Sequence, residues 1–223
     1  MQANVQLPAA SARWADPDRV KIVEHQWETV PRRRDVEALV RRLVGMVPHE
    51  SILDLGCGTA RYSELLTGWN FYMGVDESAA MLALAGARMN RILEDKNSGY
   101  IGALAQSDIR LWQPADDPFI FDLALCMEVA PHYPDPLGFI AHVVSIHKAR
   151  YFLVSVEAHD QPHLENIDFK VGEELGSCSV PRGIMEFFFK AYEVIALKQV
   201  PSVWHPDAVD WFCLLKGDIG DQD

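Results

Sequence analysis

The sequence has few cysteines, no long apolar run and little positive charge. Its four cysteines among 223 residues form no CxxC pair, which argues against a disulfide framework or a zinc site and favours a reducing compartment. No apolar stretch approaches the roughly 20 residues that cross a bilayer, and the N-terminus lacks a basic segment followed by an apolar run. We therefore expect a cytoplasmic protein without a membrane partner.

The charge balance excludes one class of partner. Lys and Arg number 20 against 32 Asp and Glu, which gives a formal net charge of -12. Proteins bind a phosphate backbone by displacing its counterions with an excess of Lys and Arg, and this chain has no such excess. We therefore expect no nucleic acid partner.

Length and composition suit one α/β domain with an added cap. Hydrophobic residues make up 49% of the chain, enough for a sizeable core. We expect an N-terminal tail and helical cap over residues 1–34, the main domain over residues 35–217, and a disordered C-terminal tail over residues 218–223.

The run from Ser51 to Arg61 is typical of a buried strand that ends in a glycine turn and opens a helix. Gly56 and Gly58 allow a sharp turn and a close approach to a ligand. The third glycine of the dinucleotide-binding pattern is missing, because Arg61 stands in its place. A carboxylate at Asp54 suits a ligand with an ammonium group and suits a pyrophosphate badly.

Strands and helices alternate around this turn. The apolar patterns predict strands over residues 52–55, 71–76, 100–105, 121–127 and 151–156, and helices over residues 35–47, 78–89 and 135–144. This alternation favours a parallel sheet with right-handed crossovers. Ligands of such sheets bind outside the carboxyl ends of the strands, where Asp54, Asp76 and Asp108 fall.

The two ends of the chain depart from the alternation. Residues 14–29 have helical character and two tryptophans, and we expect them to form a lid or cap. Near the C-terminus we expect a helix over residues 184–191, followed by strands over residues 193–200 and 211–216 that pair as a hairpin.

Together these segments resemble the class I S-adenosylmethionine-dependent methyltransferases over residues 35–217. The resemblance implies a Rossmann-like, doubly wound α/β sheet, mostly parallel with an antiparallel last strand, with helices on both faces and an N-terminal helical cap. It also implies S-adenosylmethionine as cofactor and S-adenosylhomocysteine as product. The residues that it assigns to cofactor binding are Asp54, Gly56, Cys57, Gly58, Asp76, Glu77, Met81, Asp108, Ile109, Met127 and Glu128.

The resemblance gives several of these residues a role. Asp54 would face the amino group of the cofactor, and Asp76 would receive both ribose hydroxyls, a task that needs two acceptor oxygens. Asp108 would accept from the exocyclic amine of adenine. Ile109 would lie against the adenine ring, with Met81 over its other face.

The fourth predicted strand resembles that of small-molecule enzymes in the family. The run from Phe121 to Val129 ends without the motifs of DNA amino-methyltransferases or DNA cytosine methyltransferases, and His132-Tyr-Pro-Asp-Pro follows it. We therefore expect methyl transfer to an oxygen, nitrogen or carbon nucleophile of a small metabolite, with secondary metabolism as one setting. A protein acceptor stays open.

His132 and His159 are the candidate catalytic bases, because each follows the end of a predicted strand. A histidine at such a place is more often an ordinary loop residue, so that interpretation also stays open. We predict no metal site, because His159, Asp160 and His163 lack a complete ligand set. The oligomeric state is equally open, a homodimer included.

Two other functions stay open. An NAD(P)-dependent oxidoreductase would also place Asp76 at a cofactor ribose, although Asp54 and the missing third glycine oppose it. A catalytically silent protein would use the same fold to bind a partner or to regulate an enzyme.

Overall fold

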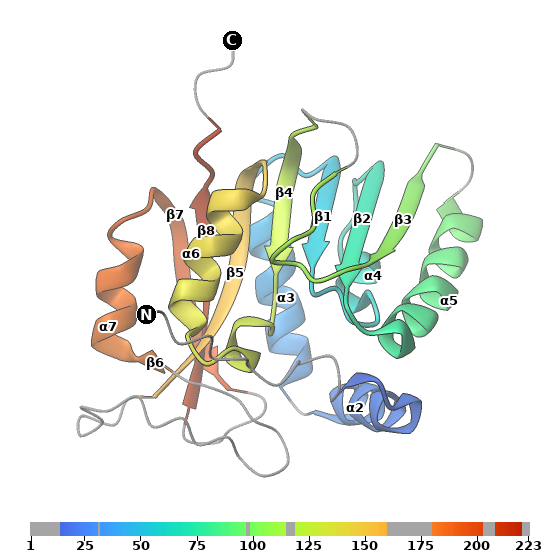
Figure 1. The fold of residues 1–223 in the computed structure, drawn as a ribbon, viewed down its shortest axis with the longest axis horizontal. Helices are drawn as coiled ribbons and strands as arrows, with labels where there is room; N and C mark the ends of the chain where they lie inside the picture. Colours follow the sequence, from blue (N-terminus) through green and yellow to red (C-terminus); the bar gives the residue numbers. More distant parts are fainter. Residues whose placement is uncertain are drawn as a thin grey trace, which may run out of the picture.

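A mixed sheet with the strand order β3-β2-β1-β4-β5-β8-β7 runs through the molecule (Figure 1). The computed structural model describes residues 14–30, 32–96, 99–114, 119–159, 180–202 and 208–219. Its strands are β1 (Ser51–Leu55), β2 (Phe71–Asp76), β3 (Ile101–Gln106), β4 (Phe121–Cys126), β5 (Ala149–His159), β6 (Val180–Pro181), β7 (Val194–Pro201) and β8 (Ala208–Lys216).

Strands β1 to β5 are parallel, and β8, which lies between β5 and the edge strand β7, runs in the opposite direction. Asp54 of β1 pairs with Gly74 of β2 on one side and with Leu125 of β4 on the other. Strand β8 runs antiparallel to β5 and to β7, and β6 adds a short parallel pairing to β5. Parallel neighbours need crossover helices between them, which explains the alternation seen in the sequence.

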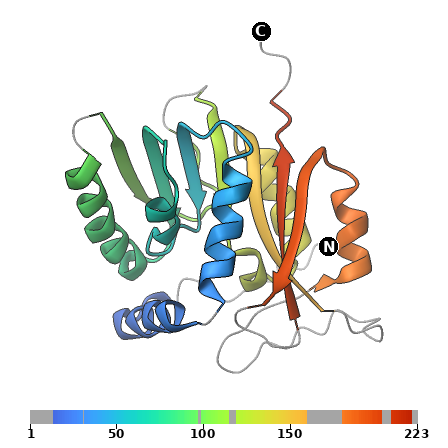
Figure 2. The same cartoon turned by 180° about the vertical axis from the view of Figure 1, so that it is seen from behind.

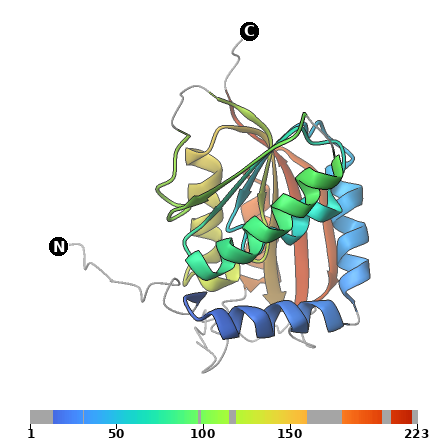
Figure 3. The same cartoon turned by 90° about the vertical axis from the view of Figure 1, so that its right-hand side faces the viewer.

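Helices cover both faces of the sheet. On one face lie α3 (Arg33–Val44), α4 (Arg61–Leu65) and α5 (Ala79–Lys96), best seen in Figure 2. On the other face lie α6 (Pro136–Ile146) and α7 (Arg182–Phe189). Helix α2 (Pro17–Thr29) crosses below the sheet, beside the carboxyl ends of β1 and β2, and a short 3-10 turn, η1 (Ala130–His132), follows β4 (Figure 3).

Each face of the sheet has its own hydrophobic core. Trp69 and Tyr72 are fully buried against α3 and α5 on the first face. Phe152 and Phe189 are buried against α6 and α7 on the second. Strands β1 and β4 are buried almost throughout, because helices cover them from both sides.

The predicted fold class is confirmed, including the antiparallel last strand and the C-terminal hairpin. Several elements are longer than the sequence indicated. Helix α5 continues from the predicted end at 89 to Lys96, and β8 begins at Ala208 instead of 211. Strand β5 continues from 156 to His159, because β8 pairs with it over that whole length. No pattern in the sequence predicted η1 or β6.

Some expectations about the chain ends stay predictions. The tail before residue 14 lies outside the described residues, as does the end of the chain after residue 219. None of the helices in the described part of the chain is both long and apolar enough to cross a bilayer.

We predict that Leu125→Ala lowers the free energy of unfolding by about 2–5 kcal/mol, because Leu125 is fully buried in the central strand β4. Urea titration followed by circular dichroism measures the change. Ile101→Ala, at an edge-strand position with 61% exposure, is the matched control and should change the value by less than about 0.5 kcal/mol. Equal losses in the two variants would contradict this account of the core.

Candidate functional site

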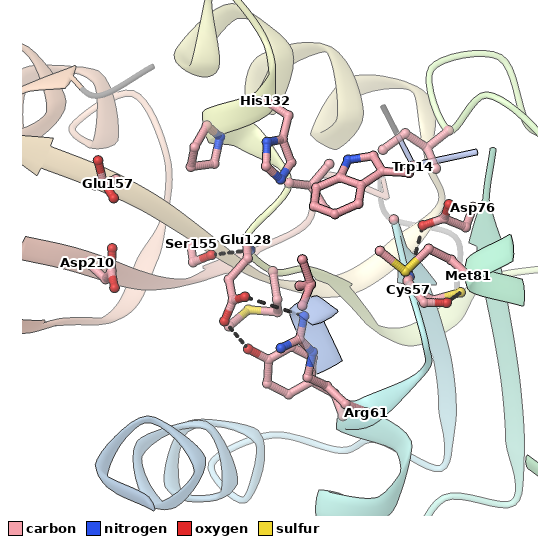
Figure 4. A pocket seen from close by; sticks show the side chains of 18 of the residues that line it. Trp14, Cys57, Arg61, Asp76, Met81, Glu128, His132, Ser155, Glu157 and Asp210 are labelled. Atoms are coloured by element: carbon pink, nitrogen blue, oxygen red, sulfur yellow. Dashed lines mark hydrogen bonds and ion pairs between the residues drawn. The ribbon is translucent and has the colours of Figure 1, made fainter. Parts of the chain in front are cut away.

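A cavity of about 180 Å³ lies at the carboxyl ends of β1, β2, β4 and β5. Figure 4 shows Cys57, Asp76 and Met81 at one end of it and Glu157 and Asp210 at the other. Its wall is formed by Trp14, Val23, Gln26, Val36, Gly56, Cys57, Gly58, Arg61, Tyr62, Asp76, Glu77, Met81, Ile109, Met127, Glu128, Val129, Pro131, His132, Tyr133, Ser155, Val156, Glu157, Asp210 and Phe212.

The glycine turn after β1 forms the floor at one end. Gly56 has φ 71° and its N–H donates to the carbonyl of Val75, as does the N–H of Cys57. A Cβ atom at Gly56 would collide with the side chain of Val129. Only glycine therefore fits here, because Val129 packs directly against the backbone of the turn, and Gly56 lines the cavity.

Asp76 joins the tip of β2 to this turn. One carboxylate oxygen accepts from the N–H of Gly58 at 2.9 Å and the other from the N–H of Ser78 at 2.8 Å. Burial raises the pKa of Asp76, although these two hydrogen bonds oppose the rise. Each oxygen keeps a further lone pair, so the side chain can accept from two ligand hydroxyls.

Asp54 is absent from the wall of the cavity, in contrast to the expected contact with a ligand. It is 1% exposed, and the Tyr72 hydroxyl donates to its Oδ2 at 2.5 Å. Burial raises the pKa of Asp54 to about 7, and the nearby charge of Asp76 adds to the rise. The sequence could not predict this, because Tyr72 belongs to the neighbouring strand.

Asp108 is also absent from the wall. Its carboxylate accepts from the Arg110 guanidinium, with the shortest contact at 2.6 Å, and this hydrogen bond lowers the pKa of Asp108. Ile109 does line the cavity, and its carbonyl is held at 2.8 Å by Nε2 of buried His147. The structure therefore brings the predicted apolar contact to the cavity but engages the predicted carboxylate elsewhere.

Helix α2 is tied to the glycine turn by an ion-pair network. Glu24 accepts from the Thr59 hydroxyl and, at 2.9 Å, from Arg88. Arg88 also donates to the carbonyl of Thr59 at 2.5 Å. Burial alone would raise the pKa of Glu24, but these hydrogen bonds and the charges of Arg61 and Arg88 lower it. These contacts hold helix α2 against the glycine turn that lines one end of the cavity.

The comparisons with known proteins point to one family. A family model described as a methyltransferase domain matches residues 53–152. The curated ubiquinone biosynthesis O-methyltransferase of Xanthomonas campestris pv. campestris is 31% identical over 140 residues, which cover 63% of this chain and 54% of that protein. Both matches support the class I S-adenosylmethionine-dependent methyltransferase family that the sequence predicted.

Solved structures of methyltransferases share the fold. The magnesium protoporphyrin IX methyltransferase of Synechocystis PCC 6803 matches with a TM-score of 0.59 and 17% identity over 90% of this chain and 84% of that one. The N-methyltransferase NodS of Bradyrhizobium japonicum matches with a TM-score of 0.61 and 15% identity over 89% of this chain and 97% of that one. This chain spans only about half the length of the Xanthomonas relative. The predicted family and fold are confirmed.

The residues of the cavity fit the cofactor of this methyltransferase family. Gly56 and Gly58 line the cavity without side chains, and Asp76 presents two oxygens at the tip of β2. The apolar side chains of Met81 and Ile109 line the same end. An adenosyl group with ribose hydroxyls and a flat ring suits this combination of polar and apolar groups.

Most of the residues predicted to bind the methyltransferase cofactor line the cavity. They are Gly56, Cys57, Gly58, Asp76, Glu77, Met81, Ile109, Met127 and Glu128, while Asp54 and Asp108 do not. His132 lines it as well, with its ring edge-on to Trp14 at 5.6 Å. The backbone of His159 ends β5, but its side chain, Asp160 and His163 lie outside the described residues. The cofactor contacts themselves stay predictions.

Sequence reasoning missed several side chains of the cavity. Arg61 and Tyr62 follow the glycine turn directly, so their closeness to the site could have been inferred from position alone. Ser155 and Asp210 reach it only because β5 and β8 pair in register, with Asp210 opposite Glu157. Within the described ranges, no three His, Cys, Asp or Glu side chains are grouped as metal ligands would be.

We predict that Asp54→Asn removes a pH dependence of stability. The carboxyl of Asp54 titrates near pH 4 when the chain is unfolded and near 7 when folded, so the folded state holds the extra proton between these values. Wild-type stability therefore falls, relative to the variant, by roughly 1 kcal/mol per pH unit as the pH rises from 4 to 7. Urea titrations at several pH values measure this difference.

Asp95→Asn, which removes an exposed carboxylate of α5, is the control for the loss of a charge. Its stability curve should run parallel to that of the wild type. If the curve of Asp54→Asn did so too, the buried, protonated state of Asp54 would be refuted.

Proposed function

We propose that this chain catalyses the transfer of a methyl group from S-adenosylmethionine to a hydroxyl oxygen of a small molecule. The observation that carries the proposal is the cavity at the strand tips, which is lined by Gly56, Gly58, Asp76 and Met81. The match to a methyltransferase domain supports the cofactor, and the name of the Xanthomonas relative supports an oxygen acceptor.

The wall of the cavity supports a small acceptor. Trp14 and His132 lie edge-on to each other in the wall (Figure 4), Phe212 adds a third ring, and Val23 and Gln26 of α2 also line the cavity. Ser155, Glu157 and Asp210 add polar groups from β5 and β8. A pocket with aromatic walls and a few convergent polar groups suits a compact organic molecule better than a macromolecular chain.

The roles of the residues follow from these positions. When bound, the cofactor supplies an electrophilic methyl group on a sulfonium, so alignment of the acceptor is the main task of the protein. Met81 and Ile109 hold the adenine and Asp76 holds the ribose. The bound cofactor would supply the methyl group to the acceptor oxygen and keep the leaving electron pair on its sulfur, and His132 would accept the hydroxyl proton.

We predict that S-adenosylhomocysteine raises the melting temperature of the protein, whereas NAD does not, because Arg61 replaces the third glycine of the dinucleotide-binding pattern. Asp76→Asn should weaken binding of S-adenosylhomocysteine by about tenfold, since an amide keeps one acceptor oxygen instead of two. Thermal shift and isothermal titration measure the two effects. The control is Asp95→Asn, which should bind as the wild type does.

If NAD raised the melting temperature and S-adenosylhomocysteine did not, the proposed function would be wrong and an oxidoreductase activity would be favoured. Unchanged binding by Asp76→Asn would remove Asp76 from the cofactor contacts. Tight binding of S-adenosylhomocysteine with no methyl transfer to any hydroxyl acceptor would favour a silent binding protein.

We predict that His132→Asn lowers the single-turnover rate of methyl transfer to phenols and catechols by about a hundredfold, because the acceptor then loses its base. The loss should shrink for acceptors whose hydroxyl is already ionised at the assay pH. Rapid-quench assays with labelled cofactor measure it, and binding of S-adenosylhomocysteine should change less than about twofold. His25→Asn, an exposed histidine of α2, is the control; an equal loss in that variant would refute the role of His132.

A further inference from the structure

The structure leaves the amino-acid end of the cofactor without its expected partner. Asp54 is buried behind the wall of the cavity and accepts a hydrogen bond from Tyr72. Its raised pKa also means that much of its negative charge is lost near neutral pH. A zwitterionic ligand end needs one group of each sign within the cavity, so other residues must supply them.

Arg61 supplies the positive group. It follows the glycine turn as the first residue of α4, and its guanidinium lies 4.4 Å above the ring of Trp27 from α2. Its Nη1 atom is buried and makes no hydrogen bond within the part of the chain that the structure describes. A buried donor without a hydrogen bond costs about 1–3 kcal/mol, so this atom is poised to donate to a ligand. The planar fork of Arg matches a carboxylate in particular.

Glu128 supplies the negative group. It follows β4 with φ 61°, a left-handed conformation that is strained for a residue with a side chain. Its N–H donates to Ser155 Oγ at 2.6 Å, and its Oε1 accepts from the Tyr62 hydroxyl at 2.9 Å. The backbone and the side chain are thus both held, and the carboxylate lines the cavity (Figure 4).

The two groups are close without being fully paired. Nη2 of Arg61 lies 3.7 Å from Oε2 of Glu128, longer than a charge-assisted hydrogen bond. The side chains are 18% and 23% exposed, so the charges are little screened. A ligand with adjacent carboxylate and ammonium groups can therefore meet both charges at once.

We propose that Arg61 and Glu128 hold the amino-acid end of the cofactor, Arg61 through its carboxylate and Glu128 through its ammonium group. This inference rests on the proposed function, because it assumes S-adenosylmethionine as the ligand. It gives Glu128 the contact that the sequence assigned to Asp54, and it gives Arg61 a role that the sequence did not suggest.

The test uses isothermal titration with three ligands that share the thioadenosine part and differ in the group attached to its sulfur. S-adenosylhomocysteine carries both groups, its decarboxylated form carries only the ammonium, and methylthioadenosine carries neither. Arg61→Gln should weaken the binding of S-adenosylhomocysteine by about tenfold and leave the binding of the other two ligands unchanged. Glu128→Gln should weaken the binding of S-adenosylhomocysteine and of its decarboxylated form alike, and again leave the binding of methylthioadenosine unchanged.

Two further variants sharpen the result. Arg61→Lys should recover part of the lost affinity, because it restores the charge but not the fork. Arg91→Gln removes an exposed arginine of α5 that pairs with Glu64, and it should bind all three ligands as the wild type does. Unchanged binding of methylthioadenosine also reports that each variant is folded at the adenosine end.

The outcomes separate this inference from the proposed function. The inference would be overturned if Arg61→Gln weakened the binding of all three ligands equally or of none. Binding of S-adenosylhomocysteine by the wild type would still support the proposed cofactor in that case. A wild-type protein that bound neither S-adenosylhomocysteine nor methylthioadenosine would overturn the proposed function itself.

Discussion

The site depends on one close backbone approach, between the turn after β1 and the tips of its two neighbouring strands. The N–H groups of Gly56 and Cys57 donate to β2, the carboxylate of Asp76 accepts from the N–H of Gly58, and Val129 fills the space that a side chain at position 56 would need. The turn is thereby fixed from both sides before any ligand arrives. A preformed edge of this kind lowers the cost of ordering the site on binding.

The same edge concentrates charge and strain. Asp54 is buried and Asp76 partly buried there, and Ala60 and Glu128 take left-handed conformations that residues with side chains rarely adopt. The network from Glu24 through Arg88 to Thr59 ties α2 to the turn and so offsets part of this cost. Packing on both faces of the sheet supplies the remaining stability, since β1 and β4 are buried almost throughout.

The sequence predicted those features of the site that depend on the local pattern of strands and helices. Gly56, Asp76 and Ile109 sit at or just after strand ends, so alternation alone brought them to one edge. It could not predict what depends on a neighbouring strand. The direction of Asp54 is set by Tyr72, and Asp210 reaches the cavity only through the register of β5 with β8. The hydrogen bond from Arg110 to Asp108 joins residues two positions apart, so the sequence alone could have suggested it.

The crystal structure of the complex with S-adenosylhomocysteine tests the central claim most directly. The account predicts the adenine between Met81 and Ile109, the ribose on Asp76 and the amino-acid end beside Arg61 and Glu128. A complex with the ligand bound away from the tips of β1, β2 and β4 would contradict it.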